Sequence, residues 1–253
     1  MTFELAIPEP VLVSLVFVRV LAVMLLAPVF SHQAVSIRVR AALAFGLALL
    51  IAPGIVAKGV VPSSLMLAVM SEFTMGMAIG LVSALVLAPV GLMAEVVSVQ
   101  GGLAAATALD PTSDAASVVL GGLMRLTATL LFLSIDGHHE VIRALWLSFD
   151  HVPLGTWPAA ESLAAIASFG GVIFEAGLRL AAPLTIVLLV SNVVVGSLGR
   201  LVPQLNLMSL QLPAQIALTL SLIAIGAGTF FEAVTNDIGS MLGLGLGTAL
   251  GGY

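Results

Sequence analysis

Residues 173–198 read IFEAGLRLAAPLTIVLLVSNVVVGSL, a run in which Glu175 and Arg179 are the only charged side chains. A helix that crosses the hydrocarbon core of a bilayer needs about 20 predominantly apolar residues, and this run meets that length. The stretch therefore predicts a long hydrophobic helix of the membrane type.

Other apolar runs recur along the chain, and each predicts a further hydrophobic helix. They are Val11–Phe30, Val39–Ala57, Leu65–Ala94, Ser117–Ile135 and Ile216–Phe231. A shorter run, Leu163–Gly171, cannot span alone and is expected to prefix the run that follows it. The fold class that follows is all-α, a membrane-type bundle of six to seven hydrophobic helices.

The overall composition agrees with this fold class. Hydrophobic residues make up 60% of the 253-residue chain and charged residues 8%, whereas globular domains average about 45–50% and about 25%. Lipid, or a large hydrophobic assembly, is therefore the expected surroundings. The net charge of −5 is scattered and offers no basic face to nucleic acid. The absence of cysteine excludes disulfides, thiolate metal sites and cysteine nucleophiles.

Prolines inside the apolar runs predict that several helices are kinked or broken. Pro28, Pro89 and Pro183 each remove one helical hydrogen bond. Pro53-Gly54 has the chemistry of a turn and predicts a break between two runs.

Ionisable residues embedded in apolar runs are costly without a partner. Glu175 and Arg179 are four residues apart, so they are neighbours on a helix and predict a buried ion pair. The remaining ones are scattered singly, which argues against a proton relay of the transporter type, and some of them must face protein or water. They are Arg19, Glu72, Glu95 and Arg125.

The segment Asp136-Gly137-His138-His139-Glu140 contains metal-ligand residue types. Adjacent histidines on a helix diverge by roughly 100°, unlike the i, i+4 pair of a helical zinc motif. We therefore expect a polar helix cap or loop here, with a metal site as the weaker alternative.

Two glycine patterns suggest close helix packing. Gly76 and Gly80 form one spaced pair. Near the C-terminus glycine recurs at every fourth position, at Gly239, Gly243, Gly247 and Gly251, with Gly245 between. This stripe predicts either a helix that another helix approaches closely or a flexible glycine-rich terminus.

Sequence signatures of catalysis are missing. The chain has no G-x-S-x-G motif, no Walker glycine loop and a single lysine, Lys58. We therefore expect a protein without enzyme chemistry and without a cofactor.

Three segments together resemble the FliR family of type III secretion export-gate subunits, called SctT or SpaR in virulence injectisomes. The early residues Arg19, Pro28, Arg38 and Arg40 fit the same family. The segments are Val99-Gln100-Gly101-Gly102 leading to Leu109-Asp110-Pro111, then Asp136-Gly137-His138-His139 followed by Ser148-Phe149 and Pro153-Leu154-Gly155, and finally residues 196–206, GSLGRLVPQLN.

This resemblance implies a FliP-like portion, residues 1–172, followed by a FliQ-like helical hairpin with a glycine-rich tail, residues 173–253. FliP and FliQ subunits would join the chain in a helical pore complex of the bacterial inner membrane. The complex would belong to the flagellar basal body and lie partly above the bilayer plane. Further implied partners are FlhB, FlhA and the unfolded export substrates.

The segment 100–117 is poor transmembrane helix, because it combines glycines with a turn-forming Asp-Pro. Irregular backbone is tolerated at membrane depth where it lines a water-filled cavity, so a pore loop or plug is predicted there. Its residues are Gln100, Gly101, Gly102, Ala105, Thr107, Leu109, Asp110 and Pro111. Relatives often have aromatic residues just before the Asp-Pro, and Ala105–Leu109 contain none.

A second site is implied at the end of the predicted hairpin. Pro203 breaks a long apolar run, and a polar tip there would face partners such as FlhB. Its residues are Arg200, Pro203, Gln204 and Asn206. Gln215, a little further along, stands where relatives frequently have lysine.

The predicted function is a non-enzymatic subunit of the flagellar export gate, which passes unfolded flagellar proteins across the inner membrane. The SctT subunit of an injectisome is one alternative. An independent secondary transporter is another, but it should show repeated halves with paired broken helices, and no such repeat is visible.

Overall fold

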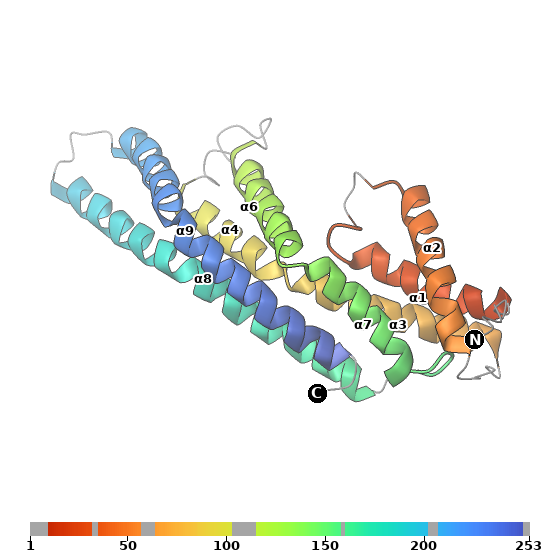
Figure 1. Cartoon of the computed structure of the whole chain (residues 1–253). Helices are drawn as coiled ribbons and strands as arrows, with labels where there is room; N and C mark the ends of the chain where they lie inside the picture. Colours follow the sequence, from red (N-terminus) through yellow and green to blue (C-terminus); the bar gives the residue numbers. More distant parts are fainter. Residues whose placement is uncertain are drawn as a thin grey trace. The chain divides into compact units, whose positions relative to one another are not determined.

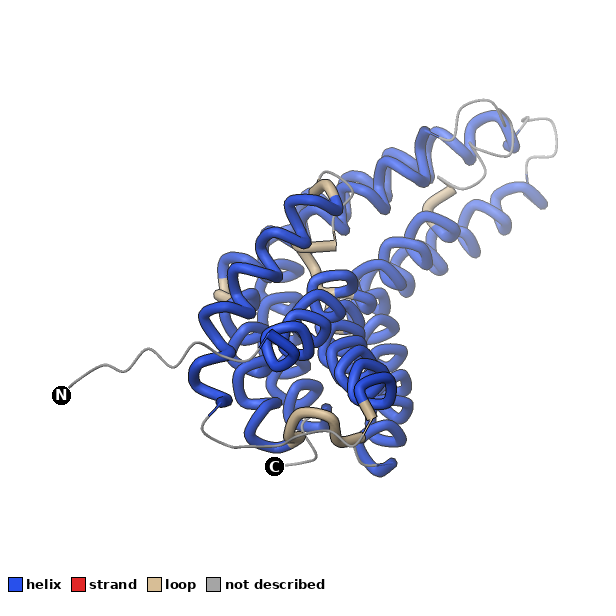
Figure 2. The backbone as a smooth tube through the Cα atoms, turned by 90° about the vertical axis from the view of Figure 1, so that its right-hand side faces the viewer, coloured by secondary structure: helices blue, strands red, loops and turns tan. Residues whose placement is uncertain are grey.

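The computed structural model describes residues 10–31, 35–56, 64–102, 115–157, 160–201 and 207–249. These residues form α-helices joined by short turns, and no strand occurs among them (Figures 1 and 2). The all-α prediction is therefore confirmed. The helices are α1 (Pro10–Leu26), α2 (Ile37–Val56), α3 (Leu65–Leu85), α4 (Ala88–Gln100), α6 (Ala115–Ser134), α7 (Gly137–His151), α8 (Ala160–Leu201) and α9 (Leu207–Ala249).

The chain divides into two compact units. Unit 1 comprises Met1–Val86, Leu133–Gly170 and Gly239–Tyr253, and unit 2 comprises Leu87–Phe132 and Gly171–Ile238. Each unit thus draws on segments that lie far apart in the sequence.

The helices differ from the predicted apolar runs in their number and in the residues at which they begin and end. The described part of the chain has eight helices and not six to seven, because α7 is added and the run Leu65–Ala94 holds both α3 and α4. Pro89 causes that division: it lies in the first turn of α4, where its missing N–H is not needed. Pro28 follows the end of α1, whereas Pro183 lies within α8. The run Leu163–Gly171 prefixes α8, as predicted.

The turn predicted at Pro53-Gly54 is wrong, because α2 continues through both residues to Val56. Pro53 removes one hydrogen bond near the end of α2, and this loss does not outweigh the packing of the last helical turns. Ile51 and Ala52 are buried, and a Cβ on Gly54 would be 3.2 Å from the Trp146 ring of α7.

In unit 1, α1 packs against α2 and α3, and α3 also contacts α7. The α1–α3 interface is close at the predicted glycine pair. A Cβ built on Gly76 would lie 2.4 Å from the Arg19 carbonyl oxygen, and one on Gly80 would lie 2.9 Å from that of Val23. Both glycines are buried, so the close-packing prediction for this pair is confirmed.

The C-terminal glycine stripe behaves differently. Residues up to Ala249 belong to α9, so this part of the stripe is helical, and Gly251 lies outside the described residues. A Cβ on Gly245 would be 2.6 Å from Val82, whereas one on Gly239, Gly243 or Gly247 would have no neighbour within 4 Å among the described residues. The close approach within unit 1 is therefore at Gly245 and not along the stripe.

Four of the described helices are long and apolar enough to cross a membrane, judged by length and composition. These stretches are Ile37–Ile55, Leu65–Leu85, Ala167–Ser197 and Gln211–Ala249. On α8, Ile186 and Val193 are 63% and 62% exposed within the chain. Exposed apolar surface of this kind is typical of helices that lipid or other proteins cover.

Candidate functional site: an anchored loop and a buried ion pair

The predicted pore loop begins at the C-terminus of α4 in unit 2. Gly101 follows Gln100, and its N–H donates to the Val97 carbonyl at 2.7 Å, which closes the last turn. Gly102 has φ +77°, a left-handed conformation that glycine adopts without steric cost. The glycines therefore turn the chain sharply away from the helix.

Helix α9 holds this turn in place. The Gln215 side-chain amide donates to the Gln100 carbonyl, and the Thr219 hydroxyl faces the Gly101 carbonyl at 3.4 Å. Gly101 has no room for a side chain, because a Cβ would lie 2.5 Å from the Thr219 Oγ1. The first two residues of the predicted loop, Gln100 and Gly101, are therefore anchored to α9.

Sequence reasoning noted Gln215 only as a departure from the family pattern. In the structure it is a main anchor of the loop. A signal for this role existed in the residue type, since an amide side chain on an apolar helix needs a partner.

Of the other predicted loop and tip residues, the structure describes only Arg200. Arg200 lies in the last turn of α8, and the rest lie outside the described residues. Their assignments stay predictions. These residues are Ala105, Thr107, Leu109, Asp110 and Pro111 of the loop, and Pro203, Gln204 and Asn206 of the hairpin tip.

Unit 1 contains a buried ion pair that sequence reasoning did not predict as a pair. The Arg19 Nε of α1 lies 2.6 Å from the Glu72 Oε2 of α3, and both side chains are fully buried. Burial of two charges is unfavourable unless each is also hydrogen-bonded by its surroundings.

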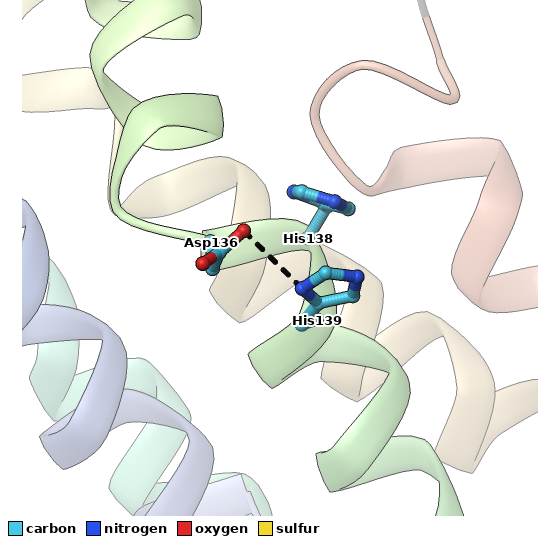
Figure 3. A group of neighbouring side chains, drawn as sticks. All are labelled: Asp136, His138 and His139. Carbon is cyan, nitrogen blue, oxygen red and sulfur yellow. Dashed lines mark ion pairs between the residues drawn. The ribbon is translucent and has the colours of Figure 1, made fainter.

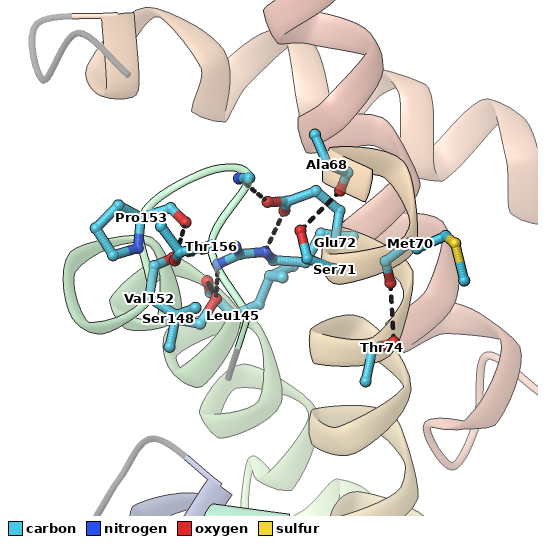
Figure 4. A network of polar contacts seen from close by, with 12 residues as sticks. Ala68, Met70, Ser71, Glu72, Thr74, Leu145, Ser148, Val152, Pro153 and Thr156 are labelled. Carbon is cyan, nitrogen blue, oxygen red and sulfur yellow. Dashed lines mark hydrogen bonds and ion pairs between the residues drawn. The ribbon is translucent and has the colours of Figure 1, made fainter. Parts of the chain in front are cut away.

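The end of α7 and the turn after it provide those hydrogen bonds (Figure 4). Arg19 donates from Nη1 to the Ser148 hydroxyl at 3.1 Å and from Nη2 to the Val152 carbonyl at 3.0 Å. The Gly155 N–H donates to the Glu72 Oε1 at 2.8 Å. The guanidinium carbon also lies 4.2 Å from the centre of the Phe149 ring, in cation–π range.

This network gives a structural role to the second of the segments on which the family resemblance rests. Ser148, Phe149 and Gly155 all belong to that segment, and all contact the Arg19–Glu72 pair. The sequence indicated that Arg19 and Glu72 each needed a partner. It could not indicate that they would pair with each other, because they come from different helices.

The predicted buried pair of Glu175 and Arg179 is wrong. Arg179 binds Asp237 of α9 within unit 2, with 2.6 Å between Nη2 and Oδ1. The Arg179 side chain is 63% exposed, and Glu175 is also exposed. Helical spacing places the two residues on the same helix face, but the guanidinium binds the carboxylate of the neighbouring helix instead.

A cavity of about 500 Å³ lies beside this pair in unit 2. Residues of α4, α6, α8 and α9 line it, and most are apolar, including Met93, Met124 and Phe230. Arg179 and Asp237 are its titratable members, and they are bound to each other.

The chain matches one known protein family and several named relatives. The family described as "Bacterial export proteins, family 1" matches residues 11–241. The flagellar biosynthetic protein FliR of Escherichia coli (strain K12) is 36% identical over 210 residues, which cover 81% of this chain and 80% of the relative. FliR of Pectobacterium carotovorum subsp. carotovorum is 34% identical over 213 residues, 83% and 81% of the two chains. FliR of Bacillus subtilis (strain 168) is 28% identical over 232 residues, 88% of each.

The family match covers most of unit 1 and all of unit 2, including the anchored loop start and the Arg19–Glu72 network. The chain therefore belongs to the family of bacterial export proteins, family 1, together with the flagellar biosynthetic proteins FliR.

Proposed function

We propose that this protein is a non-enzymatic subunit of the flagellar type III export gate. With FliP and FliQ it would form the inner-membrane pore through which unfolded flagellar proteins are exported. The observation that carries the proposal is the family match over residues 11–241. Helices long and apolar enough to span a membrane agree with it.

Two alternatives from the sequence are weaker. The relatives described above bear the flagellar name, which favours a flagellum over an injectisome. A proton-coupled transporter would need embedded acids without a fixed partner, yet Glu72 is held by Arg19 and by the Gly155 N–H.

Within the gate, we infer that the segment beginning at Gln100 is a pore loop. Its first residues are hydrogen-bonded to α9, so the loop starts from a fixed point. The predicted plug residues Ala105–Leu109 carry no aromatic side chain. A seal there would depend on the path of the backbone and on apolar side chains of neighbouring subunits, including FliP.

Assembly is the direct test of the proposed function. Expressed with FliP and FliQ from the same organism, the affinity-tagged chain should bring both down from detergent extracts. Cells that lack the chain should be non-motile, and motility should return when it is supplied. Purification of the chain alone, with full motility in its absence, would refute the proposal.

A second prediction concerns the seal. Deletion of residues 106–113 should make cells that express the gate permeable to small ions or dyes, whereas Leu109→Ala should have a mild effect. Gln215→Leu keeps the side-chain size but removes the amide that binds the Gln100 carbonyl, and it should give an intermediate leak. Dye uptake is measured alongside recovery of the assembled complex. A deletion variant that assembles and stays as tight as the wild type would show that the seal lies elsewhere.

A further inference from the structure

A cluster of metal-ligand side chains lies where α7 begins in unit 1. Asp136, His138 and His139 each offer one ligand atom, and these atoms all lie within 4.8 Å of one another (Figure 3). The sequence argument against a metal site assumed that adjacent histidines diverge. Here the two imidazole rings lie against each other instead, with centroids 4.1 Å apart and planes tilted by 36°.

The side chain of Asp136 does not cap α7. Asp136 stands at the N-cap of α7, but its side chain makes no capping hydrogen bond. Its backbone is left-handed, with φ 58° and ψ 26°, which is uncommon for a residue other than glycine. In this conformation Oδ1 lies 3.3 Å from the His139 Nδ1. Capping of α7 therefore does not account for this side chain, although its place in the turn before α7 agrees with the predicted polar loop.

His138 supplies a second and independent observation. Its Nδ1 is shielded from solvent and has no hydrogen-bond partner among the residues that the structure describes. A buried polar atom left unsatisfied costs about 1–3 kcal/mol, so native structures rarely contain one without a reason. An imidazole nitrogen without a partner, beside a second imidazole and a carboxylate, is an incomplete coordination site.

The donor set indicates the class of ion. Two imidazole nitrogens and one carboxylate oxygen suit Zn²⁺ and related divalent transition metals, whereas Mg²⁺ and Ca²⁺ prefer oxygen ligands alone. We propose that Asp136, His138 and His139 bind one divalent transition-metal ion of the zinc class. Three protein ligands leave a fourth position for water. The ion would hold the turn between α6 and α7 together and would give the His138 ring the partner that it lacks.

The test uses the full-length chain in detergent, without a polyhistidine tag and after treatment with a chelator. Titration calorimetry with ZnCl₂ should show one ion bound per chain. Asp136→Asn and His139→Ala should each weaken binding by about tenfold or more, because each removes a ligand. His151→Ala is the matched control, since it removes a histidine from the other end of the same helix and should leave the affinity unchanged.

Coordination is checked with Co²⁺, whose visible absorption should report bound nitrogen ligands in the wild type and be lost in His139→Ala. Thermal unfolding of the metal-free variants should match that of the metal-free wild type, which separates lost ligation from misfolding. The proposal is overturned if the wild type binds no Zn²⁺, if the ligand variants bind it as tightly as the wild type, or if Mg²⁺ binds equally well.

Discussion

Arg19→Ala is expected to destabilise unit 1 by about 3–5 kcal/mol, the largest effect of any single substitution considered. The loss arises because Glu72 remains fully buried without its countercharge, while the Ser148 hydroxyl and the Val152 carbonyl lose their donor. The midpoint of thermal unfolding in detergent micelles should fall sharply, and the amount of protein recovered from membranes should fall with it.

Arg179→Ala is the matched control. It removes the same side chain from an ion pair of the same 2.6 Å length, but this guanidinium is 63% exposed. Exposed pairs contribute about 0–1 kcal/mol, so the unfolding midpoint should hardly change. The double variant Arg19→Met with Glu72→Met removes both buried charges and should recover part of the stability lost in Arg19→Ala. Equal effects of Arg19→Ala and Arg179→Ala would show that burial of the first pair is not maintained.

Gly76→Ala is expected to be the second most damaging change, although it adds only one methyl group. The new Cβ would lie 2.4 Å from the Arg19 carbonyl oxygen and 2.7 Å from the Ala22 Cβ. Backbone cannot yield as a flexible side chain does, so α1 and α3 must separate. Overpacking of this kind costs about 1–3 kcal/mol and sometimes more, and thermal unfolding measures it.

Gly46→Ala provides a control of opposite sign. Gly46 lies in α2 of the same unit, and a Cβ there has no neighbour within 4 Å. Replacing a helical glycine by alanine at such a position favours the helix by up to about 1 kcal/mol. If Gly76→Ala were as stable as Gly46→Ala, the close approach of α1 and α3 would be disproved.

Much of the fold follows from local sequence, because an apolar run of sufficient length has few alternatives to a helix. Pro89 marked the division between α3 and α4, and the spacing of Gly76 and Gly80 indicated a close helix contact. Both signals act within one or two helical turns. Local rules failed at Pro53, where packing of α2 against its neighbours overrides the turn preference of a Pro-Gly pair.

The polar sites were less predictable, because their partners come from distant parts of the chain. Arg19 and Glu72 are far apart in sequence. The cost of burying a charge predicts that each needs a partner, but it does not predict which residue that partner is. The same limit explains Arg179: the nearest acid on its own helix is Glu175, but Asp237 of α9 binds it. Which carboxylate an arginine reaches depends on how helices are arranged, and that is a tertiary property.

Backbone contact between α1 and α3 also governs how unit 1 opens locally. The glycines bring the two backbones together, and the Arg19–Glu72 pair crosses the same interface and holds the turn after α7. Detaching any one of these segments would expose a charge pair and apolar side chains together, with little gain in chain entropy. We therefore expect partial opening to be suppressed, with α1, α3 and the end of α7 acting as one cooperative unit. Their amide hydrogens are expected to exchange with solvent only when the whole of unit 1 unfolds.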